Sequence, residues 1–373
     1  MHTTGVSNEV DVVVIGAGQA GLSAAYHLQN AAARSGRPRA DGIVVLDSNV
    51  RPGGAWQHRW HTLAVADVHG IYRLPGVGAD RELPATDPAN EAIPAYFADY
   101  ERRWGIRVER PVLVDSVRDT VPGDRTGLLD VITTPGTWRT RTIVNATGTW
   151  TRPFVPTYPG LETFRGRSVH TAGYDGPETF AGQHVVVVGG GASAVQLLAE
   201  ISTVATTTWV TRRPPRWRTE ERFTPEIGRE VVARVEARVR AGLPPESVVG
   251  ATGLRLREQE APAAARGVYE RRPMFAHIEP GGVRWPDGSF QHADVILWCT
   301  GFRAALDHLS PLRLREPGGG IRMDGTAVVR DARVQLVGYG PSASTTGANR
   351  AGRTAARNVV SLLTSGGELA QPA

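Results

Sequence analysis

Two glycine-rich turns are the stretches of this sequence whose residue types and spacing could do chemistry. The first, Gly16-x-Gly18-x-x-Gly21, follows the β-branched run Val12–Ile15 and leads into an Ala/Leu-rich segment. Its first glycine permits a tight bend, its second lets the backbone approach a pyrophosphate, and its third lets a helix pack on the strand. The start of that helix offers N–H groups to phosphates. With a strand before it and a helix after it, the motif favours a dinucleotide site over a plain glycine-rich turn.

The acidic residue Asp47 ends the next predicted strand, Gly42–Leu46. An acidic side chain at this place accepts hydrogen bonds from a ribose 2′-hydroxyl, and its charge repels a 2′-phosphate. The polar insertion around residues 36–42 explains why it lies further from Gly21 than the usual ~20 residues. The first site is therefore predicted to bind the ADP half of FAD.

The second turn is GGGASA at residues 189–194, with Ala194 in place of the third glycine. The predicted strand after it, Thr206–Val210, is followed by Thr211, Arg212 and Arg213, and no acidic residue stands at its end. Arginine forms charge-assisted and often bidentate hydrogen bonds with phosphate. The second site is therefore predicted to prefer NADPH over NADH, with a solvated basic turn as the alternative.

Candidate catalytic residues lie in the loop after the first two strands. Trp56 and Trp60 follow a second glycine pair at 53–54, and they could form an aromatic wall over a flat ring or simply be core tryptophans. Asp67 and His69 come next, and both are candidates for contact with substrate. A histidine in such a loop is more often a hydrogen-bonded structural residue.

Composition narrows the class of protein. The chain has 373 residues, 41% of them apolar, which is enough for two domains with real cores. No apolar run approaches the ~20 residues of a membrane span, and the start has no signal-peptide core, so a cytoplasmic location is predicted. The net charge is +5, but the basic residues are all arginines and are dispersed among acids. We therefore expect neither a nucleic-acid nor a membrane partner.

Cys299 is the only cysteine of the chain. Because there is a single cysteine, an internal disulfide, a CxxC redox pair and a cysteine-based zinc site are all excluded. No metal site is predicted.

The pattern of elements predicts an α/β fold with two doubly wound Rossmann-like domains, the second inserted in the first. Apolar spacing predicts helices at 93–104, 230–240 and 348–363. The predicted strands between 107 and 144 form a β-meander: Arg107–Val117, Leu128–Thr133 and Thr137–Val144. The predicted division is 1–155 and 294–373 for the FAD-binding domain and 156–293 for the NADPH-binding domain. Phe164–Tyr174 is predicted as a polar connector, and the active site is expected where the carboxyl edges of the two sheets face each other.

The chain resembles the class B flavin-dependent monooxygenases, which have two dinucleotide-binding domains and include short bacterial members and plant auxin-synthesis enzymes. The resemblance covers nearly the whole chain, and FxGxxxHxxxY at Phe164–Tyr174 is its most specific element. The other segments that carry it, besides the two glycine turns, are Gly53-Gly54-Ala-Trp56, Ala146-Thr147-Gly148 and Cys299-Thr300-Gly301-Phe302. Tyr174 stands where Baeyer–Villiger members usually have tryptophan, which favours heteroatom oxygenation. The usual Gly-Asp pair near the C-terminus is replaced by Gly338-Tyr339-Gly340.

The resemblance implies FAD and NADPH as cofactors. Hydride would pass from NADPH to the flavin, and a C4a-(hydro)peroxyflavin would give one oxygen atom of O2 to a small soft nucleophile (S, N or As) or a carbonyl substrate. The flavin does the reactive chemistry. Trp60, Asp67, His69 and His170 are the predicted catalytic residues, with His170 expected to couple domain movement to the cofactor. The predicted cofactor-binding residues are Gly16, Gly18, Gln19, Ala20, Gly21, Asp47, Ser48, Arg51, Gly54, Trp56, Val112, Ala146, Thr147, Gly148, Gly189, Gly191, Ala192, Ser193, Ala194, Arg212, Arg213, Thr300, Gly301, Gly340, Pro341 and Ser342.

Two other functions stay open. A flavin or quinone reductase without CxxC needs no oxygenation pocket, and a sensor protein would bind flavin and NADP with negligible turnover. The FxGxxxH element and Trp56 favour the oxygenase. The sequence does not name the substrate or the oligomeric state, for which a homodimer is one arrangement it allows.

Overall fold

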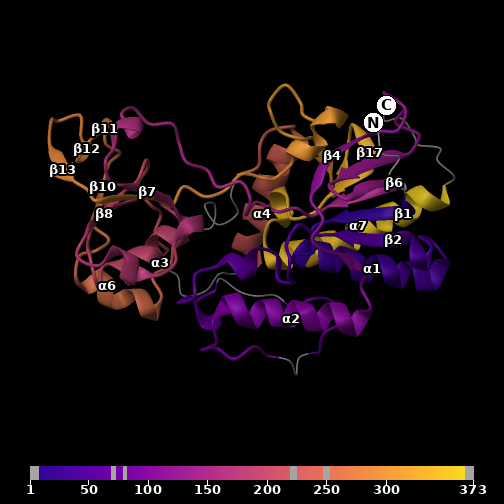
Figure 1. The fold of residues 1–373 in the computed structure, drawn as a ribbon, viewed down its shortest axis with the longest axis horizontal. Coiled ribbons are helices and arrows are strands. Elements are labelled where there is room, and N and C mark those ends of the chain that lie inside the picture. The colour runs from indigo at the N-terminus through magenta and orange to yellow at the C-terminus, as the bar shows by residue number, and fades with distance from the viewer. Residues whose placement is uncertain (1–7, 69–72, 79–81, 219–224, 247–252, 366–373) are drawn as a thin grey trace.

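The computed structural model describes residues 8–68, 73–78, 82–218, 225–246 and 253–365. These residues form two halves, each built on a sheet whose central strands are parallel. Figure 1 shows the halves side by side, with α1, α2 and α7 beside the larger sheet and α3 and α6 beside the smaller one. The inserted half lies between two stretches of chain that build the larger sheet, so the predicted fold class is confirmed.

The larger sheet has nine strands, and the first glycine turn follows its first strand. β1 lies between β2 and β6 and is parallel to both. Its last six residues are buried, as expected for a parallel strand that is covered on both faces. In chain order the strands are β1 (Asn8–Ile15), β2 (Ile43–Leu46), β3 (Val108–Glu109), β4 (Val114–Asp119), β5 (Leu129–Thr133), β6 (Gly136–Asn145), β15 (Met323–Asp324), β16 (Ala327–Val328) and β17 (Asp331–Leu336).

The predicted meander is present, since β4, β5 and β6 pair antiparallel in chain order. β6 also pairs in parallel with β1 from Trp138 to Asn145 and with β17 from Ile143 to Asn145, which joins the meander to the parallel sheet. The single strand predicted at 107–117 is two strands, because β3 pairs with β2 and β4 pairs with β5. Pro111 lies between them and has no N–H to donate to a continuous ladder.

The second half has a parallel five-stranded sheet and a small antiparallel sheet of three strands. The parallel strands, in sheet order, are β10 (Arg271–Arg272), β9 (Thr206–Val210), β8 (His184–Val188), β14 (Val295–Trp298) and β7 (Arg167–His170). The antiparallel strands are β11 (His277–Glu279), β12 (Gly282–Arg284) and β13 (Phe290–His292).

Two predictions about this half need correction. Residues 167–170 were expected in a polar connector but form the edge strand β7, which pairs with β14. The returning FAD-binding segment was expected from 294, but β14 lies between β8 and β7. The inserted sheet therefore extends to Trp298. Its outgoing and returning segments run side by side, since Phe154 N–H donates to the Gly301 carbonyl at 2.9 Å and Arg303 N–H to the Arg152 carbonyl at 2.8 Å.

The helices cover the sheets and pack closely on one another. A Cβ on Gly352 of α7 would lie 2.5 Å from Ser23 Oγ and 2.8 Å from Ala24 N of α1, so the two helices need a glycine at this contact. The described helices are α1 (Gln19–Ser35), α2 (Ala89–Trp104), α3 (Ala192–Ile201), α4 (Pro225–Arg240), α6 (Ala261–Ala265) and α7 (Thr345–Thr364). Within the described ranges, no helix has both the length and the apolar character that crossing a membrane requires.

Candidate functional site

The first glycine turn is shaped by backbone contacts and leaves room at its middle glycine. Gly16 has φ +100°, and its N–H donates to the Leu46 carbonyl at 2.7 Å. A Cβ on Gly21 would lie 1.8 Å from the Gly16 carbonyl oxygen, so helix and turn are in direct backbone contact. A Cβ on Gly18 would meet nothing within 4 Å. The open space beside Gly18, at the N-terminus of α1, fits the pyrophosphate of a dinucleotide.

Asp47 lies under this turn and is only 4% exposed. Its Oδ2 accepts the N–H of Ala17 at 2.6 Å, and its Oδ1 accepts the N–H of Asn49 at 2.8 Å. The carboxylate therefore fixes the glycine turn to the end of β2. A carboxylate has about four lone-pair sites, so it can still accept a ribose hydroxyl.

The second glycine pair lies against the first turn. A Cβ on Gly54 would come within 2.8 Å of the Gly18 Cα, and Gly54 has φ +52°. Gly54 begins the short helix η2 (Gly54–His58), which carries the partly buried Trp56. The sequence motif GGAW is thus part of the same site as the first glycine motif.

The second glycine turn repeats this design in the smaller sheet. Gly189 has φ +150°, and a Cβ there would lie 2.3 Å from the Cys299 carbonyl oxygen. The Trp209 indole N–H donates to the Gly189 carbonyl at 2.7 Å. A Cβ on Gly191 would meet nothing within 4 Å, and α3 starts at the next residue. This turn therefore also leaves room for a phosphate at a helix N-terminus.

Arg212 and Arg213 follow β9 and are exposed. No ion pair or hydrogen bond joins either guanidinium to another residue in the described ranges. The turn is held by Thr211, whose hydroxyl donates to the Arg213 carbonyl at 2.8 Å and accepts from Arg271 Nε at 2.8 Å. The two guanidinium groups are thus placed on an ordered turn and are available for an anion.

Trp60, a predicted catalytic residue, is buried between the two halves. Its indole N–H donates to Oε1 of Glu200 on α3 at 3.1 Å. Oε2 of Glu200 also accepts the hydroxyls of Thr62 at 2.6 Å and Tyr174 at 2.9 Å. Because Trp60 is 4% exposed, it packs in this contact and is not the aromatic wall of an open site. Sequence reasoning missed Glu200, since a single acid on a helix carries no motif.

Asp67 also joins the two halves. Its carbonyl accepts Gln196 Nε2 at 3.0 Å and a guanidinium N–H of Arg257, and its carboxylate accepts Gln259 Nε2 at 2.9 Å. These contacts give Asp67 a structural role in this conformation. The other candidate of this loop, His69, lies outside the described residues.

His170 positions the returning segment. Its Nδ1 accepts the N–H of Ala172 at 3.0 Å, which leaves the proton on Nε2 to donate to the Gly301 carbonyl at 2.9 Å. Desolvation lowers the pKa of His170, and the hydrogen bond to Gly301 opposes that effect. Both nitrogens of a neutral ring are therefore in use. This arrangement supports a positioning role for His170 and does not support a role as a general acid or base.

A series of hydrogen-bonded side chains holds the motif Ala146-Thr147-Gly148 at the end of β6. The Thr147 hydroxyl donates to the Ala305 carbonyl at 2.6 Å and accepts from Asn145 Nδ2 at 3.0 Å. Asn145 Oδ1 in turn accepts from His308 Nε2 at 2.7 Å. Thr147 is thus used internally, while Gly148, with φ +63° and nothing within 4 Å of a Cβ, is the open position.

The other predicted cofactor-binding residues fall into two groups. Near the first turn, Val112 N–H donates to the Asp47 carbonyl at 2.8 Å, and Gln19 Nε2 donates to Asn349 Oδ1 at 2.8 Å. Ala20, which follows Gln19, is buried. Ser48 and Arg51, which follow Asp47, are exposed. The hydroxyls of Thr300 and Ser342 donate to the carbonyls of Phe154 and Tyr339, respectively. The remaining residues of these turns are Ala146, Ala192, Ser193, Ala194, Gly301, Gly340 and Pro341, of which Ala146, Ala194 and Gly340 are buried.

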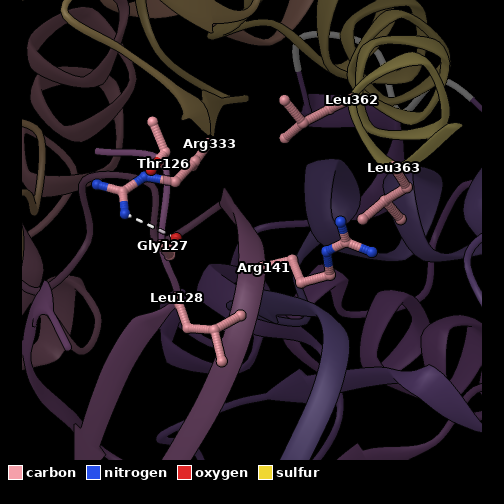
Figure 2. A pocket seen from close by; sticks show the side chains of 7 residues that line it. All are labelled: Thr126, Gly127, Leu128, Arg141, Arg333, Leu362 and Leu363. Atoms are coloured by element: carbon pink, nitrogen blue, oxygen red, sulfur yellow. Dashed lines mark hydrogen bonds between the residues drawn. The ribbon is translucent and has the colours of Figure 1, made fainter. Parts of the chain in front are cut away.

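A small cavity away from both turns carries no comparable chemistry. It has a volume of about 40 Å³ and is lined by residues of the larger sheet and α7, as Figure 2 shows. Arg333 beside it is already held by Asp331, Asp119 and the Gly127 carbonyl. This space holds at most a water molecule or two.

Comparison with known proteins identifies the group. The family described as pyridine nucleotide-disulphide oxidoreductase matches residues 13–252, which include both glycine turns. The chain belongs to this family. Within this family, the chain belongs to the class B flavin monooxygenases, and this confirms the prediction from its motifs. A solved flavin-containing monooxygenase from Stenotrophomonas maltophilia is 36% identical, and the superposition covers 95% of this chain and 99% of that one with a TM-score of 0.79.

The curated relatives of this chain are named for different oxygenation reactions. A Baeyer–Villiger monooxygenase from Streptomyces coelicolor is 32% identical over 57% of the chain, and indole-3-pyruvate monooxygenase YUCCA1 of Oryza sativa is 28% identical over 78%. The match to the Streptomyces relative spans only 39% of its length. Solved cyclohexanone monooxygenases are 18% identical and show the fold alone.

The cofactors of this group are FAD and NADPH. The residues present fit them. Each glycine turn has open space at its middle glycine and a helix N-terminus beside it. One turn lies next to a buried acid, and the other is followed by two arginines that no described residue pairs with.

Proposed function

We propose that this chain is an NADPH- and FAD-dependent monooxygenase that places one oxygen atom of O2 on a small soft nucleophile (S, N or As) or on a carbonyl substrate. One observation carries the proposal. Two dinucleotide turns of opposite electrostatic character lie on separate sheets, and Glu200 and Asp67 tie the halves together. An acid under one turn suits the ribose of FAD, and free arginines after the other suit a 2′-phosphate.

The chain's own residues bind, orient and exclude water in this proposal. The turn at 16–21 holds the ADP half of FAD, and the turn at 189–194 with Arg212 and Arg213 holds NADPH. His170 and Thr147 fix the segments that run between the halves. The bound flavin supplies hydride acceptance and oxygen activation. The substrate class stays broad, and a cytoplasmic location and a homodimer remain predictions.

A reductase is the second candidate, because a bacillithiol disulfide reductase of Bacillus cereus shares the fold with a TM-score of 0.65 at 18% identity. Burial raises the pKa of the Cys299 thiol to about 12, so this cysteine is a poor thiolate at neutral pH. The alternative is therefore a flavin or quinone reductase without thiol chemistry, or a sensor protein that binds both cofactors.

Stopped-flow absorbance of the purified flavoprotein tests the reaction. The protein is reduced by NADPH without oxygen and then mixed with oxygenated buffer. The proposal expects a transient species distinct from oxidised and reduced flavin that lives longer with NADP⁺ bound. Direct return to oxidised flavin with peroxide release would favour the reductase, and absence of reduction would favour the sensor.

The double variant R212A/R213A tests the assignment of the NADPH site. Losing two charge-assisted contacts of ~1.5–3 kcal/mol each should raise the KM for NADPH by a factor of about 100 or more and leave that for NADH within about twofold. Arg165→Ala, another exposed arginine of the same half, is the control. An unchanged NADPH/NADH preference would place the 2′-phosphate elsewhere.

A further inference from the structure

Arg59 is a largely enclosed cation with no counter-ion in the part of the chain that the structure describes. It follows η2 directly, and its N–H donates to the Trp56 carbonyl at 3.0 Å. Its Nε is buried and has no hydrogen-bond partner, and no carboxylate among the described residues forms an ion pair with the guanidinium. Desolvation lowers the pKa of Arg59 to about 10, which leaves it protonated at neutral pH.

The surroundings of Arg59 are aromatic. The guanidinium carbon lies 4.6 Å from the centre of the Trp150 ring and 5.5 Å from that of Trp56. Trp150 in turn stacks on Phe302 with the ring centres 5.1 Å apart. The ring faces stabilise the positive charge of the Arg59 guanidinium by cation–π contact. They offer no acceptor to the guanidinium N–H groups, which point along its plane.

Two other enclosed arginines of the chain, Arg333 and Arg110, have acids beside them. Arg333 lies against Asp331 and Asp119, and Arg110 donates to both carboxylate oxygens of Glu101 at 2.8 and 2.7 Å. Burying a charge without a partner is costly, so proteins pair such groups or use them to bind a ligand. Arg59 differs from Arg333 and Arg110 because no carboxylate among the described residues pairs with its guanidinium, and this difference indicates an external anion.

We propose that Arg59 is the counter-ion for the carboxylate of an apolar or aromatic acid that binds between Trp56, Trp150 and the segment at Phe302. The location supports this ligand. Trp56 belongs to the GGAW loop on the first glycine turn, and Trp150 and Phe302 lie on the two segments that connect the halves. The phosphates of both dinucleotides have glycine turns of their own, and the walls here are flat rings that suit an apolar body. The inference rests on the proposed function only in treating this acid as the substrate or a close mimic of it.

Binding measurements on the oxidised flavoprotein test the proposal without turnover. Benzoate, phenylacetate and 2-naphthoate are titrated, each against its neutral amide, with flavin absorbance and tryptophan fluorescence as readouts. The expected result is at least one acid that binds about tenfold or more tightly than its amide. In Arg59→Gln this preference should fall to within about twofold, while Arg59→Lys should keep part of it. Arg103→Gln, an exposed arginine over the Trp104 ring on α2, is the control and should bind as the unmodified chain does.

Three outcomes would overturn the proposal. The first is that no acid of the series is preferred to its amide. The second is that Arg59→Gln folds and keeps the preference; if that variant does not fold, a folded Arg59→Met that keeps the preference gives the same answer, because it too removes the charge. The third is a higher KM for NADPH in Arg59→Gln with unchanged acid binding, which would make a cofactor phosphate the partner. Since no oxygenation is measured, a failure of the proposed monooxygenase reaction would leave these readings intact.

Discussion

Single glycines of the first turn have different surroundings, and these define different roles. Gly21 is enclosed by backbone, with the Gly16 carbonyl oxygen 1.8 Å from where its Cβ would be. Gly18 faces open space, and its φ of −80° is allowed for any residue. Packing therefore requires the glycine at 21, whereas at 18 only a ligand would require it.

Replacing each of these glycines by alanine should separate folding from cofactor binding. Gly21→Ala should lower the free energy of unfolding by more than about 3 kcal/mol, because backbone atoms must move. Gly18→Ala should cost about 1 kcal/mol or less in stability but lose most of its bound FAD. Circular dichroism melting and the flavin-to-protein absorbance ratio measure the two effects. A Gly18→Ala protein with a full complement of FAD would show that the phosphate lies elsewhere.

At the scale of elements, helix α3 connects the halves through Glu200. Its carboxylate accepts hydrogen bonds from Trp60 and Thr62 of the larger half and from Tyr174 of the FxGxxxHxxxY element. The Tyr174 ring also meets the Trp60 ring edge to face at 5.7 Å. The tyrosine of this motif thus has a structural reason to be there, as His170 does in its contact with Gly301.

Removing this acceptor should loosen the contact between the halves. Glu200→Ala leaves three donors unsatisfied and should lower the free energy of unfolding by about 2–3 kcal/mol, while Glu200→Gln keeps one acceptor and should lose about half as much. Amide hydrogen exchange at residues 60–67 should quicken in the same order. The matched control is Glu236→Ala on α4, whose exposed pair with Arg240 should contribute less than about 0.5 kcal/mol. Equal effects of Glu200→Ala and Glu236→Ala would contradict this role.

At the scale of the whole molecule, enclosed histidines make stability depend on pH. Desolvation is the main cause that lowers the pKa of His27 and His308 to about 4, and it also lowers the pKa of His170 and His184. Each folded-state pKa lies below the unfolded value of about 6.5. The folded state therefore resists protonation, so stability is complete above pH 6.5 and is lost as the pH falls towards 4.

His308 should account for a measurable share of this loss. Its shift corresponds to roughly 3 kcal/mol by pH 4, and Gln at this place keeps a donor for Asn145 without titrating. Urea unfolding from pH 7.5 to 4.5, where most carboxylates stay charged, should show a shallower fall in stability for His308→Gln. Parallel curves for the two proteins would mean that His308 is not protonated on unfolding in this window.

Local patterns in the sequence determined much of this protein. The strand predicted after the second glycine turn is β9 at its predicted bounds, and the helix predicted at 93–104 lies within α2. The glycine turns and their charged neighbours Asp47, Arg212 and Arg213 also led to the cofactors, because a turn, a helix start and a strand end are set by residues close in sequence.

Only the tertiary structure decided what depends on distant residues. Nothing in the apolar run of β14 says which sheet it joins, since strand pairing is fixed by partners more than a hundred residues away. Trp60 and Asp67 read as candidate catalysts, but packing placed them against Glu200, Gln196 and Gln259. Arg59 is one arginine among many in the sequence, and only the fold places it beside Trp56 and Trp150 with no acid from the described residues paired to it. Burial and the absence of a partner are properties of a position in space, and a linear pattern does not contain them.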